Sequence, residues 1–164
     1  MPVQSMSRII SYWAARQADR VAIDHEGRAI TWGEFEERTN RLARAYSELG
    51  VQPDDFVTIA LPNGIEFFEA CFAVWKLGAT PQPISAKLPK SERDQIIDLG
   101  KPSLVVGAET GAFEQIVSVP QGFVPGEHLS AEPLPELTAA SLKAMTSGGS
   151  TGRPKLIVSA QPAA

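Results

Sequence analysis

Residues 56–84 read FVTIALPNGIEFFEACFAVWKLGATPQPI, and this stretch decides the fold. Its first six residues are apolar or β-branched and stop at the turn Pro62-Asn63-Gly64, which is the pattern of a buried strand. Residues 65–77 then predict a helix that ends at Gly78, and residues 79–84 predict a second extended segment. Strand, helix and strand in succession predict an α/β fold, with parallel strands joined by right-handed crossovers and covered by helices.

The residues before this stretch predict a helix and a small hairpin. Residues 6–18 carry apolar side chains at helical spacing, and a serine on either side of the first residue is available as a cap. Residues 21–24 and 28–31 are short extended segments, and Gly27 between them supplies the positive φ that a tight turn needs.

Two further helices have clear start signals. Thr31 and Glu34 have the spacing of a capping box, which predicts a helix that continues to Gly50. Residues 91–99 predict another helix, capped by the serine at its first position. Gly100 and Pro102 are predicted to stop this helix before a strand over residues 103–106.

The rest of the chain has weaker patterns. Residues 111–119 are ambiguous, and residues 120–135 contain proline and glutamate with little periodicity, which indicates a surface loop. Residues 141–146 and 155–159 are predicted as two strands that flank a loop. The chain stops at Ala164 without a turn or cap, and we interpret it as a piece of a longer domain, residues 1–164 forming its N-terminal part.

Length and composition favour one globular domain. The 164 residues are 43% hydrophobic and 21% charged, with a formal net charge of −4 and a pI near 5.2. This balance argues against nucleic acid as a partner, because nucleic-acid binding domains usually carry a basic surface. No run approaches the roughly 18 apolar residues that a membrane span needs, and no signal peptide is evident. A single cysteine, Cys71, cannot form an internal disulfide, so we expect a cytoplasmic protein.

The chemically informative segment is residues 146–155, which read TSGGSTGRPK. Its three glycines allow backbone N–H groups to turn toward an anion, its hydroxyls can donate to phosphoryl oxygens, and Lys155 supplies a positive charge. No Gly-Lys-Ser/Thr sequence ends it, so it is not a Walker A loop, and its glycines do not have the G-x-G-x-x-G dinucleotide spacing. By composition alone, a flexible Ser/Gly surface loop remains an alternative.

Residues 147–155 resemble the phosphate-binding signature of the adenylate-forming (AMP-binding) superfamily. This superfamily includes acyl- and aryl-CoA synthetases, luciferases and the adenylation domains of peptide synthetases. Further segments resemble the family's N-terminal landmarks in order: residues 30–35 (ITWGEF), 49–51 (LGV), 54–57 (DDFV), 61–63 (LPN) and 77–81 (LGATP). The loop version GGSTGRPK is more similar to acid–CoA ligases, including those described for bile acids, than to the commoner form.

The resemblance implies an incomplete N-terminal subdomain of the synthetase fold and an AMP-forming acid–CoA ligase, for example in fatty acid metabolism. The small-molecule partner would be a carboxylic acid, with ATP, Mg2+ and coenzyme A as cofactor or co-substrates. The residues carried over as the phosphate site are Thr146, Ser147, Gly148, Gly149, Ser150, Thr151, Gly152 and Lys155. The catalytic residues, the remainder of the domain and the C-terminal domain are expected downstream of Ala164, so this piece alone is expected to be inactive.

Two other functions remain open. The chain could be a truncated, non-catalytic paralogue or binding module, or a kinase-like protein that transfers the γ-phosphate. The sequence identifies neither the acid nor the oligomeric state.

Other reactive side chains have simpler structural interpretations. Cys71 lies among phenylalanines and is expected to be a buried thiol rather than a nucleophile. His25 and His128 are expected at the surface, and no ligand spacing predicts a metal site. Glu34, Glu36 and Glu37 are interpreted as i,i+4 partners of Arg38 and Arg41 on one helix. The aromatic cluster of Phe67, Phe68, Phe72 and Trp75 is interpreted as helical core.

Overall fold

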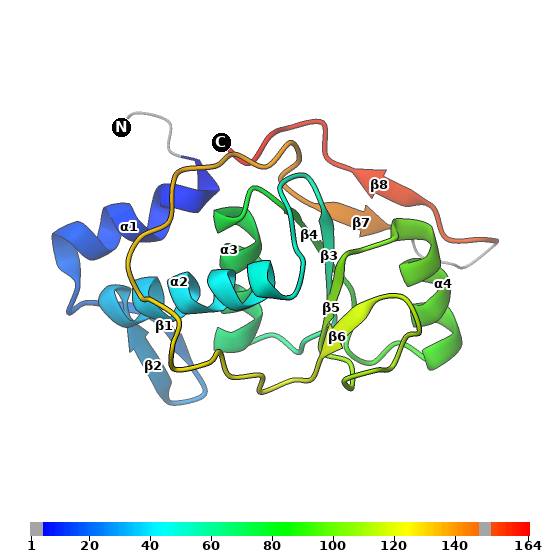
Figure 1. Cartoon of the computed structure of the whole chain (residues 1–164), viewed down its shortest axis with the longest axis horizontal. Coiled ribbons are helices and arrows are strands. Elements are labelled where there is room, and N and C mark those ends of the chain that lie inside the picture. The colour runs from blue at the N-terminus through cyan, green and yellow to red at the C-terminus, as the bar shows by residue number, and fades with distance from the viewer. Residues whose placement is uncertain (1–4, 148–151) are drawn as a thin grey trace.

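The computed structural model describes residues 5–147 and 152–164 and has an α/β architecture (Figure 1). Its helices are α1 (Met6–Gln17), α2 (Trp32–Glu48), α3 (Ile65–Lys76) and α4 (Lys90–Gly100). Its strands are β1 (Val21–His25), β2 (Arg28–Thr31), β3 (Phe56–Ile59), β4 (Thr80–Pro83), β5 (Leu104–Val106), β6 (Val117–Val119), β7 (Ala144–Thr146) and β8 (Leu156–Val158).

The central sheet has four parallel strands in the order β4-β3-β5-β6. The predicted strand, helix and strand over residues 56–84 are β3, α3 and β4, and β3 pairs with β4 from Phe56 opposite Thr80 to Ile59 opposite Pro83. Helices α2 and α3 lie on one face of this sheet and α4 lies on the other (Figure 1). The prediction of a parallel sheet flanked by helices is therefore confirmed.

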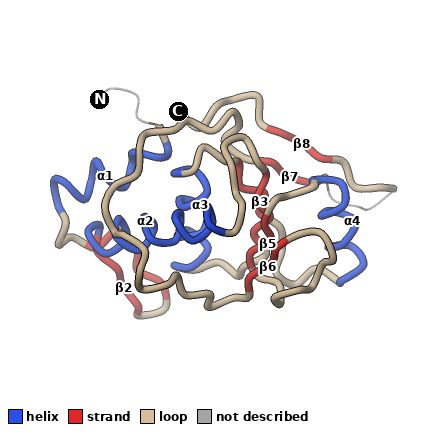
Figure 2. The backbone as a smooth tube through the Cα atoms, in the orientation of Figure 1, coloured by secondary structure: helices blue, strands red, loops and turns tan. Residues whose placement is uncertain are grey.

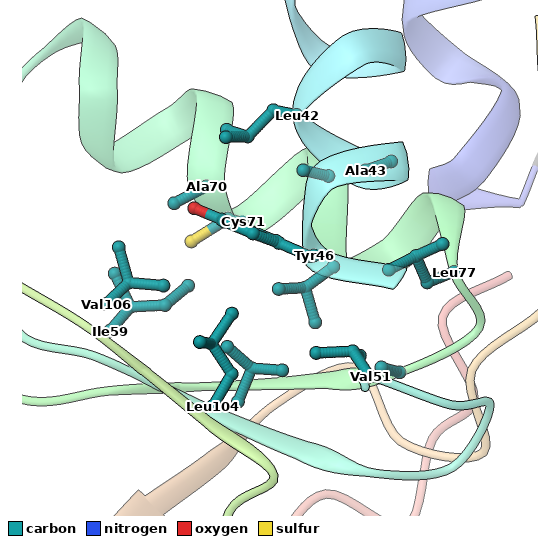
Figure 3. Close-up of a cluster of buried hydrophobic side chains, with 14 of the residues drawn as sticks. Leu42, Ala43, Tyr46, Val51, Ile59, Ala70, Cys71, Leu77, Leu104 and Val106 are labelled. Carbon is teal, nitrogen blue, oxygen red and sulfur yellow. The ribbon is translucent and has the colours of Figure 1, made fainter. Parts of the chain in front are cut away.

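The main hydrophobic core lies between this sheet and helices α2 and α3. Figure 3 shows Leu42, Tyr46 and Cys71 from the helices facing Ile59 and Leu104 from the strands. Tyr46 is 1% exposed and Ile59 and Leu104 are 0% exposed. Removing such side chains from water is the dominant favourable term in folding, so this contact joins the two layers.

The N-terminal segment packs α1 and the β1–β2 hairpin against α2. The predicted capping box is present: the backbone N–H of Glu34 donates to the Thr31 hydroxyl at 3.2 Å, and the N–H of Thr31 donates to Glu34 Oε2 at 2.8 Å. The hairpin turn places both Glu26 and Gly27 at positive φ, 51° and 78°, which is the geometry that a two-residue hairpin turn requires.

The predicted cap at the start of α4 was wrong, whereas the predicted stop at Gly100 is confirmed. The helix begins at Lys90 after Pro89, so the serine at position 91 lies inside it and does not cap it. At the other end the helix stops at Gly100, and the residue that follows, Lys101, has the left-handed conformation with φ 46°. The glycine is also needed for packing, because a Cβ on Gly100 would lie 2.7 Å from Oε1 of the buried Gln82.

A buried polar network joins the three helices on the α2 and α3 side. Lys76 Nζ on α3 donates to Glu36 Oε2 at 2.6 Å and to Asn40 Oδ1 at 2.5 Å. Ser11 on α1 donates to the other Glu36 oxygen at 2.7 Å. Glu36 was interpreted from the sequence as a partner of an arginine on its own helix, and this was wrong because its partner lies across the helix interface.

A long loop between β6 and β7 crosses the helices (Figure 2). Asn40 Nδ2 donates to the Ala131 carbonyl at 2.8 Å, and Arg44 donates to the carbonyls of Ser130 and Glu132. Helix α2 therefore holds the predicted surface loop in place with side-chain donors. Within the described parts of the chain, no helix is long and apolar enough to cross a membrane.

Gly107 marks a close approach between the ends of β3 and β5. Its φ is +96°, and a Cβ there would lie 2.3 Å from the Ala60 carbonyl oxygen. Gly111 also has a positive φ, +76°, but a Cβ there would meet nothing within 4 Å. Substitution of the two glycines therefore distinguishes the free-energy cost of backbone strain, which applies at both positions, from the cost of a steric clash, which applies at Gly107.

We predict that Gly107→Ala destabilises the chain far more than Gly111→Ala. Both substitutions introduce left-handed strain of about 1–2 kcal/mol, and only Gly107→Ala adds overpacking of about 1–3 kcal/mol. Urea unfolding of the two variants followed by circular dichroism measures the difference. Equal losses of unfolding free energy would show that β3 and β5 do not approach as closely as the structure has them.

Candidate phosphate-binding site

The candidate loop connects β7 and β8, which form a separate antiparallel hairpin. The pairing runs from Ala144 opposite Val158 to Thr146 opposite Leu156. The two strands predicted over residues 141–146 and 155–159 are thus confirmed as shorter strands within those ranges.

The base of the loop is closed by two hydrogen bonds between Ser147 and Lys155. The backbone N–H of Ser147 donates to the Lys155 carbonyl at 2.9 Å, and the backbone N–H of Lys155 donates to Ser147 Oγ at 3.0 Å. Since a hydroxyl both accepts and donates, this bond leaves the Ser147 proton available to another acceptor. The Ser147 side chain can therefore close the loop and still donate to an anion.

A cleft of about 430 Å³ lies beside the loop. The carboxyl end of β4 supplies Pro83 and Ser85, helix α4 supplies Glu92 and Gln95, and the hairpin supplies residues that include Thr146, Ser147 and Gly152. The cleft therefore combines one edge of the main sheet, the first half of a helix and the loop. Glu92 is the one acidic residue among the described residues that line the cleft, so an anionic ligand is expected to lie on the hairpin side.

The structure brings four of the eight predicted site residues to this place. Thr146 and Ser147 are half-buried and line the cleft together with Gly152. Lys155 is exposed and contributes its backbone to the base of the loop. The other four predicted residues, Gly148, Gly149, Ser150 and Thr151, lie outside the described residues.

Two side chains that the sequence did not single out as polar contacts hold the segment leading into this site. Trp75 Nε1 donates to the Leu142 carbonyl at 2.9 Å, and Thr80 Oγ1 donates to the Ser141 carbonyl at 3.2 Å. Both donors lie more than 60 positions from their acceptors. Local periodicity carries no signal for such contacts, although an indole in a core always has an N–H that needs a partner.

The remaining candidate residues have the structural places that the sequence suggested, with three exceptions: His25, Phe68 and Arg38. His128 is exposed and contacts Glu48 Oε1 at 3.1 Å, whereas His25 is half-buried beside Gly64 rather than fully at the surface. Phe68 is 44% exposed, so it is not core, although its ring contacts Phe67 edge to face. Arg38 pairs with Glu69 of α3 at 2.6 Å and not with a glutamate of its own helix.

Residues 10–163 match the family described as AMP-binding enzyme. The chain therefore belongs to the AMP-binding enzyme family, as its resemblance implied.

Two relatives illustrate its similarity to known proteins. The chain is 32% identical over 166 residues to the 2,3-dihydroxybenzoate-AMP ligase of Bacillus subtilis (strain 168), an alignment that covers 88% of this chain and 31% of that protein. It is 40% identical over 80 residues to a 3-oxocholest-4-en-26-oate–CoA ligase of Rhodococcus rhodochrous, which covers 49% of this chain and 14% of the ligase. The chain thus spans less than a third of the length of either relative.

Solved structures of one protein show the same fold. An artificially fused adenylation–PCP di-domain, NpsA-ThdA from Klebsiella oxytoca, superposes with a TM-score of 0.81 at 20% identity, covering 96% of this chain and 33% of that chain. The N-terminal subdomain of NpsA by itself superposes with a TM-score of 0.80, covering 95% of this chain and 41% of that chain. The predicted fold, an N-terminal subdomain of the adenylate-forming type, is confirmed by this likeness.

The reactivity of Cys71 tests whether its thiol is buried in the core. The side chain is 4% exposed, and burial raises the pKa of the thiol from 9.0 to about 12. At pH 8 the thiolate fraction is therefore roughly a thousandfold below that of an ordinary cysteine. We predict negligible reaction of the native chain with a thiol reagent such as DTNB at pH 8, and complete reaction in urea. Rapid labelling of the native chain would contradict the buried placement.

Proposed function

We propose that the polypeptide to which this chain belongs activates a carboxylic acid with ATP, forming an acyl-adenylate and pyrophosphate, and then transfers the acyl group to a thiol. The observation that carries this proposal is the loop over residues 146–155, closed at its base by Ser147 and Lys155 and open to a cleft. Its glycines, hydroxyls and cation suit a polyphosphate, and the family match supports an adenylate-forming role. We also propose that residues 1–164 form the N-terminal part of the large AMP-binding domain.

In the proposed reaction, a carboxylate oxygen attacks the α-phosphorus of ATP, and the bond from that phosphorus to the bridging oxygen of pyrophosphate breaks. The loop contributes by holding the β- and γ-phosphates while negative charge moves onto the departing pyrophosphate. The hydroxyls of Ser147, Ser150 and Thr151 would donate hydrogen bonds to phosphate oxygens, and Lys155 would offset negative charge on the pyrophosphate. Mg2+ bound to the triphosphate would neutralise part of its charge when present.

The backbone of the loop would contribute as much as its side chains. Gly152 lines the cleft and carries no side chain that would keep a phosphate oxygen from its N–H. The same argument from residue type extends to Gly148 and Gly149, which would turn further N–H groups toward the phosphates. Thr146, at the end of β7, would set where the loop begins.

For the thiol acceptor we propose coenzyme A, which would make the enzyme an acid–CoA ligase. The name of the Rhodococcus relative and its 40% identity over the aligned residues support this choice. The alternative acceptor is the thiol of a carrier protein, supported by the adenylation–PCP architecture of NpsA-ThdA. Incubation of the complete polypeptide with ATP, a panel of carboxylic acids and coenzyme A, followed by mass spectrometry, distinguishes a CoA thioester from an adenylate that accumulates without CoA transfer.

We predict that Ser150→Ala with Thr151→Ala in the complete polypeptide lowers acid-dependent ATP–pyrophosphate exchange by at least about a hundredfold. Donors of this kind contribute on the order of 2–4 kcal/mol each to transition-state stabilisation. Radiolabelled pyrophosphate exchange measures the effect, and Thr110→Ala, an exposed threonine on another loop, serves as the matched control.

Unchanged exchange in the double variant would contradict the assigned role of the loop. Production of ADP instead of AMP would favour a kinase-like reaction. Absence of any acid-dependent nucleotide turnover in the complete polypeptide would favour a truncated, non-catalytic paralogue or binding module.

A further inference from the structure

The hairpin that carries the loop is not part of the main sheet. Strands β7 and β8 pair only with each other, although β4 lies beside β7 (Figure 1). Among the described residues, no backbone hydrogen bond joins β4 to residues 141–147. Backbone bonds attach the far end of the hairpin instead, where Ala163 N donates to the Ala139 carbonyl and Met6 N donates to the Ala163 carbonyl. The placement of β7 against the sheet therefore depends on side chains.

Two side-chain donors make this connection at adjacent carbonyls. Thr80 is the first residue of β4, is 2% exposed, and donates to Ser141 O. Trp75 lies in the last turn of α3 and donates to Leu142 O. Residue 143 alone separates these carbonyls from β7, and the loop begins directly after that three-residue strand. A displacement of residues 141–142 is thus transmitted to Ser147 over only five positions.

The two donors also satisfy acceptors that have little access to water. The Thr80 bond lies in the interior, and the Trp75 bond is partly buried. An unsatisfied buried carbonyl costs free energy comparable to a lost hydrogen bond. Moving the segment would leave these two carbonyls without donors, so the segment is held where both donors reach it. Apolar packing alone would allow β7 to slide along β4, whereas two fixed donors define its register.

We propose that Trp75 and Thr80 are positioning residues for the phosphate-binding loop, setting the place of Ser147 and the loop base relative to the cleft at the carboxyl end of β4. The inference rests on the proposed function for its catalytic consequence, because the loop must bind phosphates for its position to matter. Its structural part, the anchoring of the hairpin, stands without any ligand. Neither side chain touches the nucleotide in this proposal.

The first experiment measures hydrogen exchange in the 164-residue chain with Trp75→Phe and Thr80→Val, which keep most of the side-chain volume and remove the donor. The amides of Ser147 and Lys155 report the loop base, and the amide of Ala60, which donates to Val106 O at 2.8 Å, reports the main sheet. We expect exchange at the loop base to rise roughly three- to tenfold, as the loss of one hydrogen bond implies, while exchange at Ala60 stays unchanged.

Matched controls separate anchoring from general destabilisation. Trp13→Phe makes the same chemical change in α1, and Thr39→Val removes a buried hydroxyl that donates only within α2. Neither should change exchange at the loop base relative to the main sheet, and Thr80→Ser should restore the wild-type rate. Unchanged exchange in both test variants, or an equal rise at all three amides, would overturn the anchoring.

The second experiment measures acid-dependent pyrophosphate exchange in the complete polypeptide. We expect both test variants to raise KM for ATP about three- to tenfold and to leave KM for the acid unchanged, because the loop would hold the phosphates and not the acyl group. Equal changes in both KM values, or none, would overturn the positioning role. Absence of exchange in the wild type would instead refute the proposed function, and the hydrogen-exchange result would still decide the anchoring.

Discussion

The buried ion pair between Lys76 and Glu36 is the constraint on which the helical layer depends. Lys76 is 3% exposed, and burial lowers the pKa of its amine, while the hydrogen bond that the amine donates to Glu36 opposes that change. Taking two charges out of water is costly, and it is tolerated when the remaining hydrogen-bonding capacity is used. Here Asn40 and Ser11 complete the set. Removing one partner of such a pair typically costs about 3–5 kcal/mol, because it leaves the other charge buried and uncompensated.

The network fixes more than two helices. Asn40 uses its oxygen for Lys76 and its amide for both Glu36 and the Ala131 carbonyl. The long loop is therefore bound to the same polar cluster that aligns α1, α2 and α3. An all-apolar interface would permit small sliding motions of the helices, whereas a set of directional bonds admits one arrangement. The loop that leads to β7 starts from a well-defined position for this reason.

The sequence predicts local elements well where one short pattern determines the outcome. The capping box of Thr31 and Glu34, and the strand, helix and strand over residues 56–84, depend on neighbours within a few positions, and they were predicted correctly. The start of α4 was wrong because the serine at position 91 has the chemistry of a cap but lies inside the helix, and the N-cap position is taken by Pro89, with ψ 145° and no side-chain cap. Its stop at Gly100 was predicted, but the packing of Gly100 against Gln82, a residue 18 positions away in the sequence, was not.

The residues of the candidate loop could be predicted from the sequence, whereas the distant side chains that hold the loop in place could not. The run of glycines and hydroxyls is local and visible in the sequence, so Ser147 and Lys155 could be named as candidates from it. The interaction between Glu36 and Lys76 spans 40 positions, and the bond from Trp75 to Leu142 spans 67. Each depends on how helices stack on the sheet, and a single sequence carries no periodic trace of it.

Residues 75–80, which run from the end of α3 to the start of β4, connect the hydrophobic core, the Lys76–Glu36 network and the candidate phosphate-binding site. Lys76 points into the buried network, while Trp75 beside it on the helix points toward the segment before β7. Gly78, with φ +69°, then turns the chain so sharply that Thr80 already begins β4. A Cβ at Gly78 would lie 3.1 Å from Leu137 in the long loop, so that loop also packs against the turn. Because Trp75 and Lys76 are consecutive on a helix, they diverge by about 100°. One rigid turn can therefore hold the helical layer on one side and the phosphate loop on the other, which makes the position of the loop a consequence of the same packing that stabilises the fold.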